Sequence, residues 1–320
     1  MTAKLPPWFL GTVALVGLSL VPGLVLSLTQ HREVAAVSAM ASVACLLAGV
    51  FAGWRIAAVT AIALGAASGL ACVVTSSAAP AALLMVCCAV AVGLSAHWGL
   101  SGGLITAPIM VGFILAEPPE ATAALVAVVM GISGLFSALV CWLVRHRLPN
   151  LPRHQTSLSR AAAYAAVLGV LIATATVLVV EMQYGHPGAW IILTVFVVVQ
   201  PYLQDGWTKA IQRAAGTVVG FIIAVVIGAI ITAPPLLYVV GTVCLLAAVG
   251  AYAQGRAYWV YAAPLTIAIV LLEGAATSVQ ETAGERLVAT LIGVVISVCA
   301  MALLQPIYRR TALAHGVEHY

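Results

Sequence analysis

The sequence predicts an all-α polytopic membrane protein, with about twelve transmembrane helices arranged as two parallel repeats of about six helices each. Three observations lead to this prediction: the composition, the lengths of the apolar segments and the distribution of charge. The 320 residues are 63% hydrophobic and only 7% charged, whereas a soluble domain usually carries about 25% charged residues. So few charges cannot cover a water-exposed surface. The apolar runs are also continuous, unlike the alternating strands of an outer-membrane barrel.

The apolar segments have the length of membrane spans, since a helix needs about 20 apolar residues to cross the hydrocarbon core. Spans are expected near residues 8–29, 34–52, 56–75, 80–97, 100–117 and 121–144, and then near 161–181, 187–203, 210–232, 234–252, 257–273 and 286–306. The predicted organisation is an N-terminal membrane repeat (1–145), a basic cytoplasmic linker (146–160), a C-terminal membrane repeat (161–308) and a cytoplasmic tail (309–320).

The charges are distributed unequally between the two sides of this predicted topology. With a cytoplasmic N-terminus, all basic residues except Arg32 and Arg286 fall inside, and all acidic residues except Asp205 and Glu318 fall outside. Lys and Arg in short cytoplasmic loops fix the orientation of membrane proteins. We therefore expect a multi-pass protein of the cell inner membrane with both termini in the cytoplasm. The net charge of +4 then reflects topology and does not indicate a nucleic-acid partner.

The two halves resemble each other. APIMVGFILAE at Ala107–Glu117 matches APLTIAIVLLE at Ala263–Glu273, and Arg55 lies where Arg213 lies, at the cytoplasmic edge of a third span. Because each half has an even number of spans, both halves start on the same side. The repeats are therefore expected to be parallel, and transporter sites often lie between such repeats.

One motif in the second half combines a charge with small residues. Arg213, Gly216, Thr217 and Gly220 lie on one helical face. Glycines four residues apart let a neighbouring helix approach closely, so Gly216 and Gly220 are expected to be packing positions. For Arg213 two interpretations stay open: the side chain extends to the lipid headgroups, or it faces a cavity and holds an anion.

Polar and aromatic residues near the span ends also have two interpretations. Trp190 and Tyr258 are expected first as interfacial anchors, and a flat aromatic substrate could also stack on them. His186 is either a solvated loop histidine or a gating or binding residue. Thr266 follows Pro264 and could offer polar contacts where the proline loosens the backbone.

Three ionisable residues, Glu117, Glu273 and Arg286, are expected at the outer ends of spans, as solvated loop edges or as functional groups. The chain has no hydrolase triad, phosphate-binding loop or metal-ligand cluster, so we expect no enzyme activity, no cofactor and no metal site. The cysteines all lie in apolar runs and are expected to pack as small apolar residues: Cys45, Cys72, Cys87, Cys88, Cys141, Cys244 and Cys299.

Several short motifs follow one another in the second half: His186 to Trp190 with Thr194, Gln200-Pro201, Arg213-x-x-Gly216-Thr217-x-x-Gly220, Tyr258-Trp259, Pro264-Leu265-Thr266, and Arg286 with Gly293. In their order and spacing, residues 161–306 resemble the fusaric acid resistance protein-like family, also called the integral membrane bound transporter domain. The first half looks like a degenerate copy, with Ala58 and Val59 in place of the Gly-Thr pair and Ala124 in place of Arg286.

The resemblance implies efflux or conduction of organic anions, since similar proteins include bacterial exporters of aromatic carboxylic acids and plant malate-permeable anion channels. Many of those exporters carry a large cytoplasmic domain, where this chain has only a short linker. That departure leaves the substrate class and the coupling to partner subunits open.

We therefore expect a transporter that exports small organic anions of the aromatic carboxylate type. An anion channel of the same fold and a non-transporting scaffold or envelope-biogenesis partner are the alternatives. The expected partners are the lipid bilayer, the anion and a second copy or an accessory subunit. The candidate substrate-binding residues are Arg213, Arg286, Trp190, His186, Thr194, Tyr258 and Thr266, and the candidate packing residues are Gly216, Thr217, Gly220 and Gly293.

Overall fold

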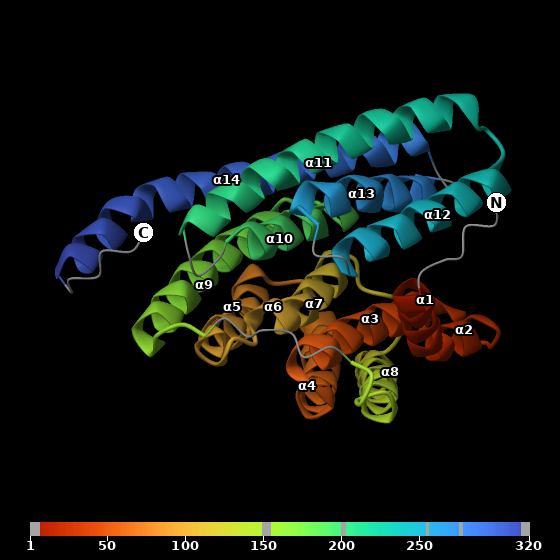
Figure 1. Ribbon diagram of the computed structural model, residues 1–320, viewed down its shortest axis with the longest axis horizontal. Coiled ribbons are helices and arrows are strands. Elements are labelled where there is room, and N and C mark those ends of the chain that lie inside the picture. The colour runs from red at the N-terminus through yellow and green to blue at the C-terminus, as the bar shows by residue number, and fades with distance from the viewer. Residues whose placement is uncertain (1–6, 149–154, 200–202, 254–255, 275–277, 315–320) are drawn as a thin grey trace. The chain divides into compact units, whose positions relative to one another are not determined.

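The computed structural model describes residues 7–148, 155–199, 203–253, 256–274 and 278–314, and within these ranges the chain is helical with no strand. The predicted linker and tail lie partly outside the described residues. The chain forms two compact units, Met1–Phe196 (unit 1) and Val197–Tyr320 (unit 2), whose helices are labelled in Figure 1.

Unit 1 contains the first ten α-helices and two short 3-10 helices. Their bounds are α1 Pro7–Ser19, α2 Val21–Ser27, η1 Arg32–Val34, α3 Ala35–Ala52, α4 Trp54–Val74, α5 Ala78–Ser95, η2 Ala96–Trp98, α6 Ser101–Leu104, α7 Thr106–Ala116, α8 Ala123–Leu143, α9 Leu158–Glu181 and α10 His186–Val198, of which the last two residues already belong to unit 2. Unit 2 continues with α11 Leu203–Ile230, α12 Pro234–Ala253, α13 Tyr258–Gly274 and α14 Val279–Ala314.

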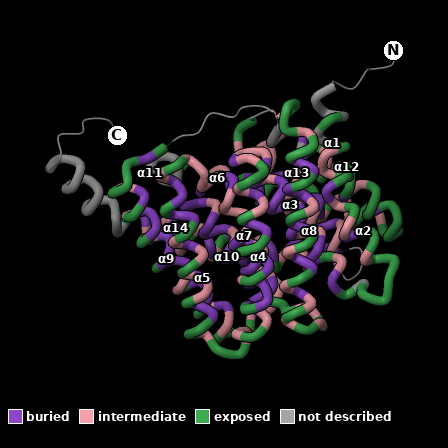
Figure 2. The backbone as a smooth tube through the Cα atoms, turned by 90° about the horizontal axis from the view of Figure 1, so that it is seen from below, coloured by how far each residue is buried: buried purple, intermediate pink, exposed green. Residues whose placement is uncertain are grey.

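By length and hydropathy, 7 helices of the described chain can cross a membrane: α3, α4, α5 with η2, α8, α9, most of α11 and the first part of α14. Shorter apolar helices cover Ser101–Ala116, His186–Val198, Pro234–Ala248 and Tyr258–Gly274. Large apolar side chains point outward from the long helices, including Val59 and Ile62 on α4, and Figure 2 shows exposed and buried positions alternating along each helix. Such outward apolar faces suit lipid. The protein is therefore a multi-span membrane protein.

Two expected spans are interrupted. The segment 8–29 forms α1 and α2, because Pro22 stands at the start of α2 and has no N–H to continue the hydrogen bonding of α1. The segment 100–117 forms α6 and α7, with Pro108 in the first turn of α7. In contrast, α3 and α4 are separated by Gly53 alone, whose φ of +94° is easily adopted only by glycine.

The core of unit 1 is built on close helix packing. Helices α3, α4 and α8 contact one another, and a Cβ on Gly65 of α4 would lie 2.6 Å from the Ala127 carbonyl oxygen of α8. Ser38 of α3 and Ser133 of α8 join their hydroxyls at 2.7 Å inside this core. In the same unit, Gly93 of α5 lies directly against Ala165 of α9. Small residues thus allow the backbones to approach, as in many membrane bundles.

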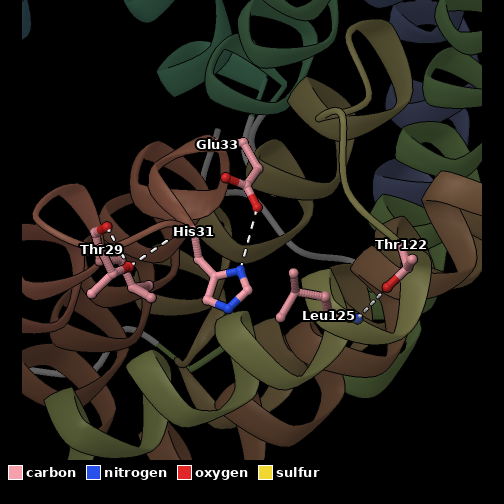
Figure 3. Close-up of polar contacts among 6 residues, drawn as sticks. Thr29, His31, Glu33, Thr122 and Leu125 are labelled. Atoms are coloured by element: carbon pink, nitrogen blue, oxygen red, sulfur yellow. Dashed lines mark hydrogen bonds and ion pairs between the residues drawn. The ribbon is translucent and has the colours of Figure 1, made fainter.

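Local side-chain contacts stabilise the helix ends at one edge of unit 1 (Figure 3). Thr122 caps α8 by accepting a hydrogen bond from the Leu125 N–H at 3.3 Å. In the loop before α3, His31 Nδ1 lies 3.5 Å from a carboxylate oxygen of Glu33, and the His31 N–H donates to the Thr29 hydroxyl at 3.1 Å. Both contacts are between near neighbours in sequence, so they stabilise this edge locally.

The four helices that lie wholly in unit 2, α11 to α14, pack around one apolar core. Figure 1 shows α11, α13 and α14 running side by side, and each of the three contacts the other two, while α12 contacts α13. The apolar cluster at their centre consists of Ala224, Leu237, Ile267, Val270, Leu271, Val279 and Ala283.

Candidate functional site

Two arginine side chains lie inside unit 2. Arg213 of α11 and Arg286 of α14 are each 1% exposed and are the largest fully buried side chains among the described residues. A guanidinium group in a protein stays charged, and removing a charge from water costs several kcal/mol unless an opposite charge or hydrogen-bond acceptors compensate it. Such burial is therefore unusual for a purely structural position.

Arg213 does not extend toward the surface. Its Nη1 donates a hydrogen bond to the Tyr258 hydroxyl at 3.2 Å, and the neighbouring Gln212 accepts one from the Tyr258 N–H at 2.9 Å. Together these bonds fix the start of α13 against α11. The Arg213 Nε and Nη2 atoms have no hydrogen-bond partner among the described residues. Of the two interpretations of Arg213, the buried geometry favours the inward-facing one.

Arg286 lies deeper in its helix than the sequence suggested. The predicted span starts at residue 286, but α14 starts at Val279, seven residues earlier. Val279 and Ala283 are buried in the core, and this packing extends the helix through a segment that reads as polar. The expected start of this helix at residue 286 was therefore wrong, because Arg286 lies seven residues inside α14.

The charges around Arg286 are mixed. The Arg213 guanidinium repels it and the Glu273 carboxylate attracts it, and the phenol groups of Tyr258 and Tyr261 on α13 lie in the same region. Glu273 is half-buried near the end of α13. All three helices thus contribute ionisable groups to the same region of unit 2.

Buried hydroxyl groups accompany the two arginines. Thr217 follows Arg213 by one helical turn, Thr290 follows Arg286 by one turn, and Thr266 is on α13. All three threonines are buried, and their hydroxyls have no hydrogen-bond partner among the described residues. An O–H left without a partner in the interior is unfavourable, so these groups are available to an acceptor from a ligand.

Glycines bring α11 and α13 into close contact beside these polar groups. A Cβ on Gly216 would lie 2.8 Å from the Ala262 Cβ, and one on Gly220 would lie 2.7 Å from the Ala263 carbonyl oxygen. Any larger residue would push the helices apart. Gly293 is buried one turn before Ser297, whose hydroxyl donates to the Gly293 carbonyl oxygen at 2.8 Å.

The other predicted site residues lie in unit 1. His186 Nδ1 at the start of α10 is 2.8 Å from a Glu117 carboxylate oxygen after α7. Trp190 is 5% exposed and packs edge-on against Phe113, with ring centroids 4.8 Å apart. The Thr194 hydroxyl donates to the Trp190 carbonyl oxygen at 2.7 Å. Here the polar groups are satisfied within the unit.

The structure thus places Arg213, Arg286, Tyr258 and Thr266 in unit 2 and the remaining candidates in unit 1. The sequence prediction missed Thr290 and Gln212 as members of the polar group. The signal for Thr290 was its spacing, since it follows Arg286 as Thr217 follows Arg213. Within the described residues, no cluster of three or more His, Cys, Asp or Glu side chains could hold a metal.

Comparison with known proteins identifies the segment that carries this geometry. Residues 172–300 match the family model described as fusaric acid resistance protein-like. This segment includes both buried arginines and every other candidate substrate-binding residue. No curated protein and no solved structure shows significant similarity to the chain.

Proposed function

We propose, from the fusaric acid resistance protein-like domain at residues 172–300, that this membrane protein exports small organic anions. The observation that carries the proposal is the buried Arg213 guanidinium, whose Nε and Nη2 have no hydrogen-bond partner among the described residues. A second guanidinium, that of Arg286, is buried within its electrostatic reach. Two buried cations of this kind favour an anionic ligand.

The geometry of Arg213 suits a carboxylate. Nε and Nη2 form one edge of the planar guanidinium group, and their N–H bonds point in parallel, as the two oxygens of a carboxylate require. Since Tyr258 occupies Nη1, this edge remains for a ligand. The hydroxyls of Thr217, Thr266 and Thr290 could donate further hydrogen bonds. The aromatic rings of Tyr258 and Tyr261, 5.6 Å apart, favour an anion with a flat apolar part.

The membrane potential supplies a driving force in the proposed direction. An interior-negative potential favours the exit of an anion by about 2.3 kcal/mol per charge per 100 mV. A buried cationic site lowers the cost of taking a carboxylate out of water. Substrate contacts by His186, Trp190 and Thr194 stay a prediction, and their internal contacts also suit a purely structural role.

We further propose the complete topology of two parallel repeats in the inner membrane, with both termini in the cytoplasm. The long candidate spans, the shorter apolar helices and the α1–α2 pair together support a total of about twelve crossings. The cytoplasmic excess of Lys and Arg supports the orientation. The division into repeats 1–145 and 161–308 is a property of the sequence pattern, whereas the two compact units meet between Phe196 and Val197.

The test is flux through the purified protein in liposomes. Vesicles are loaded with a panel of aromatic and aliphatic carboxylates, and a membrane potential of either sign is imposed. Selective, saturable efflux that depends on the potential is the expected result. Non-saturating currents that reverse at the equilibrium potential of the anion would instead assign a channel. No flux above that of empty liposomes, from folded protein, would overturn the proposal and favour a scaffold.

A further inference from the structure

Close contacts fix how α11 and α14 lie against each other in unit 2. A Cβ on Gly228 of α11 would lie 2.6 Å from a side-chain carbon of Val279 of α14. Toward the start of α11 and later in α14, Ala210 and Met301 belong to one apolar cluster. The two helices therefore run antiparallel, and a residue before Gly228 lies level with the residue that follows Val279 by the same number of positions.

This arrangement places three buried threonines near one level of the unit. Thr217 is eleven residues before Gly228, and Thr290 is eleven residues after Val279, so the two are level with each other. A Cβ on Gly220 would lie 2.7 Å from the Thr266 Cβ of α13, and Gly220 is three residues after Thr217, or about 5 Å along the helix axis. We call Thr217, Thr266 and Thr290 the hydroxyl layer.

The two buried arginines lie on opposite sides of the hydroxyl layer. Arg213 is one turn before Thr217 on α11, and Arg286 is one turn before Thr290 on α14. Because these helices are antiparallel, one arginine lies on each side along the axis. Each threonine of the layer is at most 1% exposed, and its hydroxyl has no hydrogen-bond partner among the described residues.

The place of the hydroxyl layer, and not the lack of partners alone, points to a ligand. Buried hydroxyls without a partner in the described part of the chain also occur in unit 1, at Ser42 and Ser137. The hydroxyl layer differs because it lies one turn, about 6 Å along the axis, from Arg213, whose Nε and Nη2 are open to a carboxylate. A small organic anion can span that distance, and a buried O–H group needs an acceptor.

We propose that the hydroxyl layer is a second subsite for the same anion. While Arg213 holds the carboxylate, one or more of the three threonines donates a hydrogen bond to a carbonyl-type oxygen elsewhere on the substrate. This inference deepens the proposed function and rests on it. It predicts selectivity for carboxylates with such an oxygen, since a site built for a hydrogen bond rejects an analogue that leaves its polar groups unpaired.

Two pairs of ligands test this selectivity at neutral pH: 4-acetylbenzoate with 4-isopropenylbenzoate, and 3-acetylbenzoate with 3-isopropenylbenzoate. Within each pair the charge and the shape are the same, and a methylene group replaces the carbonyl oxygen. Binding to the detergent-purified protein is measured by calorimetry, and efflux is measured in liposomes. The variants are Thr217→Val, Thr266→Val and Thr290→Val, singly and combined. The matched control is Thr242→Val on α12, whose exposed hydroxyl already donates to the Tyr238 carbonyl oxygen at 2.7 Å.

In at least one pair, the wild-type protein should bind the acetyl ligand about fivefold more tightly than its isopropenyl partner, the factor that corresponds to one hydrogen bond of about 1 kcal/mol. At least one single valine variant should bring this ratio close to one. The control Thr242→Val should keep the wild-type ratio, because its hydroxyl lies outside the hydroxyl layer.

Two results would overturn the inference while leaving the proposed function intact. One is a wild-type protein that transports carboxylates but binds the isopropenyl ligand of both pairs as tightly as the acetyl ligand or more tightly, a result that needs no variant to fold. The other is a folded protein with all three valines that keeps the preference for the acetyl ligand. If the wild-type protein neither binds nor transports any carboxylate of the wider panel, the proposed function itself fails, and the inference fails with it.

Discussion

Positions that correspond in the two halves of the sequence have opposite environments in the two units. Arg213 is buried, whereas its counterpart Arg55, at the start of α4, is exposed with its guanidinium carbon 5.5 Å from the centre of the Trp54 ring. Thr217 is buried, whereas the counterpart Val59 points outward. The same helical pattern can therefore pack against lipid or enclose charge, depending on which residues occupy one face.

The interiors of the two units differ in the same way. Among the described residues of unit 1, the fully buried polar side chains carry hydroxyl groups and no charge, and Ser38 and Ser133 satisfy each other. Buried hydroxyls without a hydrogen-bond partner among the described residues occur in both units, for example Ser42 in unit 1 and Thr290 in unit 2. Within the same residues, buried guanidinium groups occur in unit 2 alone. The buried charges, and not the unpaired hydroxyls, therefore distinguish unit 2, and charged groups inside a membrane protein are candidates for a functional site.

The largest difference between the two units is expected in efflux, when their corresponding arginines, Arg213 and Arg55, are each replaced by alanine. Arg213→Ala should lower carboxylate efflux about 100-fold, because the loss of charge-assisted hydrogen bonds worth about 3 kcal/mol corresponds to roughly that factor. Arg55→Ala, its matched control, should leave efflux within about twofold, since an exposed charge contributes little. Efflux in liposomes is measured alongside the amount of protein inserted. Unchanged efflux in Arg213→Ala would remove this residue from the site.

Much of the fold could be predicted from the sequence, because apolar length and composition alone determine which helices can cross a membrane. The long spans of unit 1 agree with the expected ranges to within a few residues. The boundary between the units could not be predicted in this way. It depends on α9 packing against α5, a contact between segments far apart in the chain that helical periodicity does not encode.

The site could be predicted only in part. A lone Arg213 in an apolar stretch is visible in the sequence, but its burial is not, because lysine and arginine near span ends often extend to the headgroups. The depth of Arg286 depends on where α14 begins, and helix ends are set by tertiary packing as much as by local sequence. The unsatisfied hydroxyl of Thr290 becomes evident only when all neighbouring acceptors are placed.

In unit 1, adding one methyl group should lower the stability of the protein at Gly65 but not at Gly131. Gly65→Ala would place its Cβ 2.6 Å from a backbone oxygen of α8, and forced overpacking of this kind costs about 1–3 kcal/mol. Gly131→Ala would place its Cβ 4.0 Å from the Ala61 carbonyl oxygen, its nearest neighbour outside the helix, so it should be neutral or stabilise the helix by up to about 1 kcal/mol. Thermal unfolding in detergent measures both, and equal effects would contradict the close approach of α4 and α8.

Removing one hydroxyl from each unit should change stability in opposite directions. Ser38→Ala leaves the Ser133 hydroxyl without its partner and should cost about 1 kcal/mol of unfolding free energy with no effect on efflux. Thr266→Val removes a buried hydroxyl that has no partner among the described residues, so stability should stay the same or rise. Anion affinity should nevertheless fall severalfold if this hydroxyl contacts the ligand. Calorimetry and chemical unfolding distinguish the two effects, and a loss of stability in Thr266→Val would show that the hydroxyl is structural.

The smallest effect is expected for a change at Glu117, the carboxylate of unit 1 that corresponds to Glu273 in the sequence pattern. Glu117 ends the first of the two matching segments and pairs with His186 at 2.8 Å, but their side chains are 64% and 38% exposed. An ion pair so open to its surroundings contributes at most about 1 kcal/mol and is weakened by salt. Glu117→Gln should therefore lower the unfolding temperature by a few degrees at most, less in high salt, and should leave carboxylate efflux within about twofold of the wild-type rate. A loss of efflux as large as the one expected for Arg213→Ala would mean that Glu117 takes part in transport, and the contrast between the two units would no longer hold.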